Sequence, residues 1–152
     1  MLKDGDKAPD FSLQADTAEE ISLKNLKGKK VVLYFYPKDD TPGCTKEACD
    51  FRDSYSKFQK SGALIYGVSG DSLDSHRKFK QKYSLPFPLL ADPGNKLAET
   101  YGAYGEKNMY GKKTMGIIRS TFVIDEKGKI EKVYRHVKVD GHAEALLTQL
   151  SA

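Results

Sequence analysis

The amino-acid sequence predicts an α/β fold in which helices flank a mixed central sheet. Continuous apolar, β-branched and aromatic runs at residues 29–36 and 63–69 are typical of strands that are covered on both faces. Apolar side chains recur at helical spacing after each of these runs. Strands that alternate with helices in this way are characteristic of α/β proteins. A length of 152 residues fits a single domain, residues 1–152, with its own hydrophobic core.

The predicted elements follow one another along most of the chain. A helix follows the strand at residues 29–36 and ends at Gly62, a residue type that is common just beyond helix ends. The strand at residues 63–69 leads into a helix at residues 73–83, which the prolines of "SLPFP" stop. The remaining predictions are an extended segment at residues 88–92, a helix at 95–101, a hairpin of strands at 120–125 and 129–137, and a helix around 143–150.

One segment, residues 101–118, shows no clear period. Its sequence, "YGAYGEKNMYGKKTMGII", is rich in Gly, Lys, Tyr and Met. We expect a long loop there, either a partly apolar wall of a functional pocket or an exposed excursion of the chain. A nucleic-acid patch through Lys107, Lys112 and Lys113 is disfavoured, because the segment contains no recognised binding motif and the net charge is only +4.

Composition and charge disfavour several classes of protein. Acidic and basic residues are mixed, so bulk charge does not indicate binding to a polyanion. The first residues lack the apolar core of a secretory signal, and the longest apolar run, residues 31–36, is too short to span a membrane. We expect a soluble cytoplasmic protein that binds neither nucleic acid nor membranes. In that reducing compartment a cysteine pair indicates catalysis or redox activity rather than a permanent disulfide.

The two cysteines, Cys44 and Cys49, lie in the stretch "YPKDDTPGCTKEACDF". Thr41 followed by Pro42 indicates a helix start, with the threonine as N-cap and the proline as the first helical residue. Cys44 is then in the first turn, where free backbone N–H groups and the helix dipole favour a thiolate. The alternative is an inert buried cysteine beside a threonine that only caps the helix.

The spacing of the cysteines is incompatible with a disulfide in an intact helix. Five positions along an ideal helix place the Cα atoms of Cys44 and Cys49 about 8.7 Å apart. A disulfide requires Cα atoms within about 7 Å of each other. Either the two thiols never bond, or the start of the helix unwinds when they do, which would be a redox switch.

Metal binding and CxxC chemistry are both disfavoured. Zinc requires four ligands, and His76, His136 and His142 show no ligand spacing with one another or with the cysteines. A thioredoxin-type CxxC motif has two residues between its cysteines, whereas four residues separate Cys44 from Cys49. We predict neither a metal nor a cofactor.

The stretch around Cys44 resembles the active-site motif of the peroxiredoxins, which are thiol peroxidases. Their pattern of Pro, three residues, Thr, two residues and Cys corresponds to Pro37, Thr41 and Cys44. The segments "GDKAPDFSL", "FPLLADP", "YGEKNMYGK" and "GIIRSTFVID" follow in the family's order, so the resemblance extends along nearly the whole chain. The spacer to Cys49 is similar to that of the Q-type, or bacterioferritin-comigratory-protein, branch. The resemblance implies a thioredoxin-like fold.

The resemblance also implies a role for each matching residue. Cys44 corresponds to the peroxidatic nucleophile, and Cys49 to the resolving cysteine that forms a disulfide with it. Thr41 corresponds to the hydroxyl that contacts the thiolate and the peroxide. Pro37 corresponds to the residue that shields the pocket.

Two further residues match a charged pair of the family. Arg119 corresponds to the arginine that stabilises the thiolate of Cys44, and Glu47 to the acid that holds this arginine. Without the resemblance, Arg119 would be interpreted as a surface arginine at a strand end and Glu47 as a solvated helix residue.

The activity implied by the resemblance is antioxidant: a thiol-dependent peroxidase that reduces hydrogen peroxide and organic hydroperoxides. A dithiol donor such as thioredoxin would reduce the Cys44–Cys49 disulfide, and the branch resemblance implies a monomer. Two alternatives remain open, a thiol–disulfide oxidoreductase and a redox sensor or holdase that uses the thiols only as a switch. Fast reaction of Cys44 with hydrogen peroxide, followed by turnover with a dithiol, distinguishes the peroxidase from both.

Overall fold

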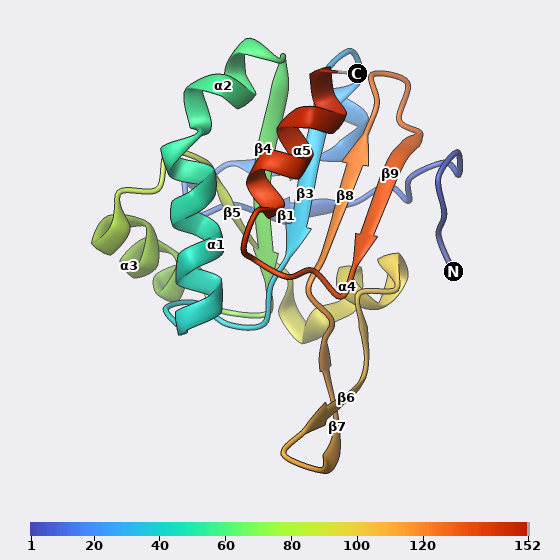
Figure 1. Ribbon diagram of the computed structural model, residues 1–152. Helices are drawn as coiled ribbons and strands as arrows, with labels where there is room; N and C mark the ends of the chain where they lie inside the picture. The colour runs from blue at the N-terminus through green and yellow to red at the C-terminus, as the bar shows by residue number, and fades with distance from the viewer. Residues whose placement is uncertain (152) are drawn as a thin grey trace.

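The computed structural model describes residues 1–151, and its centre is a five-stranded sheet with helices on both faces (Figure 1). The strands are β3 (Lys30–Phe35), β4 (Ala63–Ser69), β5 (Leu89–Ala91), β8 (Ser120–Ile124) and β9 (Ile130–Arg135). Their order across the sheet is β5-β4-β3-β8-β9. Strands β3, β4 and β5 are parallel, whereas β8 is antiparallel to β3 and to β9. The sheet is mixed, and the predicted fold class is confirmed.

Short helices and two small hairpins surround this sheet. The α-helices are α1 (Pro42–Asp53), α2 (Tyr55–Lys60), α3 (Leu73–Tyr83), α4 (Lys96–Tyr101) and α5 (His142–Ser151). The hairpins are β1 (Ser12–Gln14) with β2 (Glu20–Ser22) and β6 (Tyr104–Met109) with β7 (Lys112–Ile117). Two 3-10 helices, η1 (Leu23–Leu26) and η2 (Pro93–Asn95), complete the described chain. Within residues 1–151 no helix has the length and apolar character needed to cross a membrane.

Strand β3 separates two hydrophobic cores, because successive side chains of a strand point to opposite faces. Tyr34 packs among buried residues of α1, α2, α3 and α5 on one face. Phe35 packs on the other face, among residues of α4 and of the N-terminal segment. Cys44 belongs to the first of these cores. Its sulfur is therefore held by the same packing that holds the sheet and helices together.

The helix predicted to run from residue 42 to Gly62 is two helices, and the prediction of a continuous helix is wrong. The break is at Ser54, whose φ of −106° and ψ of 9° are not helical. Phe51 and Phe58 are both fully buried on the two sides of this break. Phe51 and Phe58 are seven positions apart, which fits one face of a continuous helix. The sequence pattern therefore does not reveal the break at Ser54.

The segment at residues 101–118 contains a β-hairpin rather than the predicted loop. Strands β6 and β7 pair in antiparallel register around Tyr110 and Gly111, which have φ angles of 52° and 79°. Two consecutive left-handed residues are the turn type that closes two-residue hairpins. The hairpin projects away from the body of the protein (Figure 1). Because most of its β7 side chains are exposed, it shows no alternation of apolar and polar residues.

Hairpin β1–β2 lies outside the predicted elements. Its strands have only three residues each, which is too short for a period of two to show. The other predicted strands and helices, including the hairpin of β8 and β9 and the C-terminal helix, are confirmed to within two residues at their ends.

Candidate active site

Cys44 lies in the first turn of α1, just beyond the end of β3 that carries the connection to this helix. Its side chain is buried. The first hydrogen bond of the helix is from the Thr45 N–H to the Thr41 carbonyl, at 2.8 Å. The N–H groups of Gly43 and Cys44 precede this bond and have no acceptor within the helix. They are donors available to a ligand next to the sulfur.

Thr41 is at the N-cap position, as predicted, but its side chain does not cap the helix. Its hydroxyl instead donates a hydrogen bond to the carbonyl oxygen of Lys38, at 2.8 Å. An ordinary capping threonine would accept the N–H of the second or third helical residue. Because Thr41 does not do so, the N–H groups of Gly43 and Cys44 remain unpaired by it.

Arg119 joins Cys44 to Glu47. It lies in the connection between β7 and β8, and its Nη2 lies 3.4 Å from the Cys44 sulfur. Its Nη1 donates to Glu47 Oε1 at 2.7 Å. Gly43 allows this approach, since a Cβ at position 43 would lie 3.2 Å from Arg119 Nη2. Residues that are far apart in the sequence are thus brought together as predicted, although their catalytic roles remain proposals.

Burial has the largest effect on the pKa of the Glu47 carboxyl group. Desolvation of the buried Glu47 side chain raises its pKa to about 7, although Arg119 lowers it in part. Burial lowers the pKa of Arg119, but the neighbouring Glu47 and Cys44 outweigh that effect and leave it raised. Arg119 is therefore always charged, whereas Glu47 changes its charge near neutral pH.

Replacing Glu47 by glutamine is expected to change how stability depends on pH. Between the ordinary pKa of 4.5 and the folded value of about 7, the folded protein retains a proton that the unfolded chain has released. The resulting stabilisation is fully present below pH 4.5 and is lost as the pH rises through 7. The shift corresponds to about 3 kcal/mol of stability. A glutamine side chain does not titrate, so the variant lacks this dependence on pH.

Urea denaturation of the reduced protein at several pH values from about 4 to 8 tests this expectation. The free energy of unfolding of wild type should fall relative to that of Glu47→Gln as the pH rises. The exposed Glu144→Gln on α5 is the matched control and should follow wild type at every pH. A constant difference between wild type and Glu47→Gln would contradict the raised pKa.

Cys49 lies five positions after Cys44 in the same uninterrupted helix, and both are free thiols. Their Cα atoms are therefore about 8.7 Å apart, beyond the reach of a disulfide. Cys49 is half-buried, and desolvation raises the pKa of its thiol. Pro37, the fourth residue before Thr41, is half-buried in the connection from β3 to α1. The predicted resolving role and shielding role of these two residues remain proposals.

Helix α1 is anchored on both sides of its cysteines. On the N-terminal side the buried Asp39 accepts a hydrogen bond from the Tyr36 hydroxyl at 2.6 Å. On the C-terminal side Phe51 is fully buried, and Arg52 Nη1 donates to the carbonyl of Tyr83 at 2.7 Å. Unwinding of the turn that holds the cysteines can therefore leave both flanking segments in place.

His142 is a neighbour of the site. From the sequence this residue is considered only as a zinc ligand, and its spacing is unsuitable for that role. It is the first residue of α5, and its Nε2 lies 2.8 Å from Thr121 Oγ1. Burial, and after it the positive charge of Arg119, lowers the pKa of His142 to about 4. The imidazole is neutral at neutral pH. No sequence motif links it to Arg119, because only the folded chain places α5 beside β8.

Asp39, Asp71 and His76 place three potential ligand atoms within 4.8 Å of one another. The ring of His76 is already engaged on both sides, by Asp39 Oδ2 at 2.7 Å from Nδ1 and by the Leu90 carbonyl at 2.9 Å from Nε2. A carbonyl oxygen can only accept, so Nε2 carries a proton and offers no lone pair to a metal. These residues form a hydrogen-bond network. No motif in the sequence predicts it.

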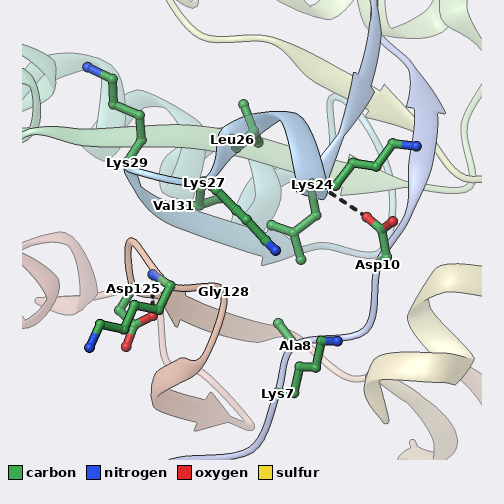
Figure 2. A pocket seen from close by; sticks show the side chains of 12 residues that line it. Lys7, Ala8, Asp10, Lys24, Leu26, Lys27, Lys29, Val31, Asp125 and Gly128 are labelled. Carbon is green, nitrogen blue, oxygen red and sulfur yellow. Dashed lines mark hydrogen bonds between the residues drawn. The ribbon is translucent and has the colours of Figure 1, made fainter.

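A cavity of about 110 Å³ lies at the other end of β3 (Figure 2). Its apolar lining includes Leu23, Leu26 and Val31. Five lysines surround it: Lys7, Lys24, Lys27, Lys29 and Lys127. Val31 is near the start of β3, whereas Cys44 follows its end. A substrate in this cavity could not contact the Cys44 sulfur.

The site places a buried cysteine sulfur beside the positive charge of Arg119 and beside backbone N–H groups that have no acceptor within the helix. On a mixed sheet flanked by helices, this arrangement defines a thiol-based redox protein with a thioredoxin-like fold. The chain belongs to the AhpC/TSA family, whose sequence pattern matches residues 5–133.

Individual relatives agree with this family. Peroxiredoxin Bcp of Bacillus subtilis is 55% identical over 145 residues, covering 95% of this chain and 92% of the relative. The Xanthomonas campestris bacterioferritin comigratory protein has a solved structure with a TM-score of 0.88 and 42% identity, over 93% of this chain and 90% of that one. A cysteine-to-serine mutant of Xylella fastidiosa PrxQ has a TM-score of 0.93 and 35% identity, over 99% and 96% of the two chains.

Proposed function

We propose that the protein is a thiol peroxidase that reduces hydrogen peroxide and organic hydroperoxides through Cys44. The contact of Arg119 Nη2 with the Cys44 sulfur is the observation that carries this proposal. A guanidinium at that position stabilises a thiolate and the negative charge of an attacked peroxide. The structure of the Xanthomonas relative was determined in connection with its alkyl peroxide reduction activity, which supports the same substrate class.

The first step is attack of the Cys44 thiolate on one peroxide oxygen. A sulfur–oxygen bond forms, the oxygen–oxygen bond breaks, and the departing oxygen leaves with the electron pair and takes up a proton as water or alcohol. The N–H groups of Gly43 and Cys44 and the guanidinium of Arg119 are positioned to donate to the peroxide as charge develops. Cys44 is left as a sulfenic acid.

In the second step Cys49 condenses with this sulfenic acid. The disulfide forms, one water molecule leaves, and an external dithiol then reduces the bond to two thiols. Because the two cysteines are too far apart in the intact helix, the first turns of α1 must unwind before the bond can form.

Three finer features belong to the same proposal. The dithiol donor is thioredoxin or a protein of similar chemistry, the enzyme acts as a monomer, and it works in the cytoplasm. The first two follow from the Q-type resemblance of the Cys44–Cys49 spacing. The third agrees with a cycle that depends on a dithiol donor, which a reducing compartment supplies.

Direct kinetics test the function. The chain contains no tryptophan, so rapid quenching followed by mass spectrometry is the appropriate measure of sulfenic acid and disulfide. Reduced protein should react rapidly with hydrogen peroxide and with tert-butyl hydroperoxide, and should turn over with a dithiol. Reduction of insulin or glutathione disulfide without peroxide would indicate a thiol–disulfide oxidoreductase instead. A single slow oxidation without turnover would indicate a sensor or holdase.

Cys49→Ser is expected to separate the two steps. The variant should react once with peroxide at a rate close to that of wild type, because Cys44 and Arg119 are unchanged. It should then stall as the sulfenic acid and, with excess peroxide, proceed to the sulfinic acid. Intact mass should show one added oxygen and then two, whereas wild type loses two hydrogens. Sustained turnover of Cys49→Ser with thioredoxin would contradict a resolving role.

A further inference from the structure

The orientation of the Thr41 hydroxyl depends on one peptide group. Thr41 Oγ1 donates its only proton to the Lys38 carbonyl, at 2.8 Å. Its oxygen can then act only as an acceptor toward a ligand. A hydroperoxide carries one O–H that needs an acceptor, while Gly43 and Cys44 supply N–H donors. The direction of the Lys38 carbonyl therefore determines whether Thr41 complements a peroxide.

Asp71 holds the opposite side of that peptide. The Lys38 carbonyl and the Asp39 N–H belong to one planar peptide unit and point in opposite directions. The Asp39 N–H donates to Asp71 Oδ2 at 2.8 Å. The same oxygen accepts from the Ser69 hydroxyl at 2.7 Å, at the end of β4. Rotation of the peptide would break the bond to Asp71 and the bond to Thr41 together.

The side chain of Asp39 prevents the peptide from moving as a whole. Its carboxylate is buried and accepts from the Tyr36 hydroxyl at 2.6 Å and the Ser75 hydroxyl at 2.8 Å. It also faces His76 Nδ1 at 2.7 Å, and His76 is fixed in turn by the Leu90 carbonyl. With the Asp39 side chain held in this network, the contact with Asp71 fixes the remaining freedom, which is rotation of the peptide plane.

We propose that Asp71 is a positioning residue for peroxide reduction, an inference that rests on the proposed peroxidase function. It acts through the peptide between Lys38 and Asp39, and keeps the Thr41 hydroxyl turned away from the helix. Without Asp71 the peptide can rotate, and Thr41 becomes free to cap the helix as threonines ordinarily do. A capping Thr41 would engage the N–H groups of Gly43 or Cys44 and withdraw them from the substrate.

The test compares variants in the reaction of reduced protein with hydrogen peroxide under single-turnover conditions. Asp71→Ala should lower the second-order rate constant about tenfold, and Asp71→Asn should recover most of it, because an amide oxygen accepts the same N–H. Reduction of the disulfide by a small dithiol should be unchanged in both. Asp74→Ala is the matched control, since Asp74 is exposed and contacts Arg77 on its own helix.

A double-mutant cycle with Thr41→Val distinguishes positioning from a general loss of structure. In the Thr41→Val background, Asp71→Ala should change the rate by less than about twofold, because the hydroxyl it orients is gone. An equal loss in both backgrounds, or no loss in wild type, would overturn the inference. If Asp71→Ala fails to fold, Ser69→Ala, which removes the hydroxyl that holds Asp71, should give a smaller loss that also disappears with Thr41→Val. A wild type that does not react with peroxide would refute the proposed function itself, whereas a fast wild type with unaffected Asp71 variants refutes only the positioning role.

Discussion

Cys44→Ser is expected to abolish peroxide consumption and to leave the fold unchanged. The attacking species is a thiolate, and a serine hydroxyl does not ionise in this environment to replace it. The loss should exceed about a thousandfold, since Cys49 is the only other thiol and burial raises its pKa. Serine is close to cysteine in size, so the packing of α1 against β3 should persist. Peroxide consumption with a dithiol donor, together with urea denaturation, measures both expectations.

The control for this prediction is Cys49→Ser, which removes the other thiol from the same helix. It should retain the first reaction with peroxide, so a loss confined to Cys44→Ser identifies the nucleophile. Substantial peroxidase turnover in a folded Cys44→Ser protein would exclude Cys44 from that role and transfer it to Cys49.

Arg119→Ala is expected to slow the attack on peroxide about a hundredfold, which corresponds to about 2.7 kcal/mol in the barrier. The substitution removes the donor 3.4 Å from the Cys44 sulfur and leaves Glu47 buried without its partner. The effect should be confined to the chemical step, because reduction of the disulfide by a small dithiol does not use Arg119. Single-turnover rates with hydrogen peroxide provide the measurement.

Arg119→Lys refines this prediction. Lysine keeps the charge but has one nitrogen, whereas Arg119 uses Nη1 for Glu47 and Nη2 for Cys44. The lysine variant should therefore recover only part of the lost rate. A lysine variant as fast as wild type would mean that charge alone is sufficient. An alanine variant as fast as wild type would remove Arg119 from the mechanism.

The parts of the fold that the sequence predicts are those in which packing and local pattern agree. Strand β3 is buried on both faces and is visible as a continuous apolar run, and α3 has its apolar residues at helical spacing. Hairpin β6–β7 is different, because it packs little against the body and its order comes from a turn with Tyr110 and Gly111 at positive φ. A single Tyr-Gly pair between polar strands is a weak signal, and the sequence pattern therefore predicts a loop.

The site divides in a similar way. The positions of Cys44 and Thr41 can be predicted from the helix start. The resemblance supplies Glu47 on the same helix and Arg119 from a distant segment. Asp71 has no such signal. Its bond to the backbone of residue 39 depends on where the loop after β4 passes the loop after β3, and no local sequence pattern encodes that meeting.

The anchoring of α1 on both sides has a consequence for the competition between thiols. In the proposed cycle the turn around Cys44 unwinds while Asp39 and Phe51 keep its ends in place, so Cys49 would explore only a small volume around the sulfenic acid. A short tether of this kind gives an effective concentration on the order of millimolar or more. External thiols at lower concentration will lose to Cys49, and most sulfenic acid will proceed to the disulfide. The stiffness of the helix flanks would thus determine which thiol, that of Cys49 or an external one, reacts with the sulfenic acid.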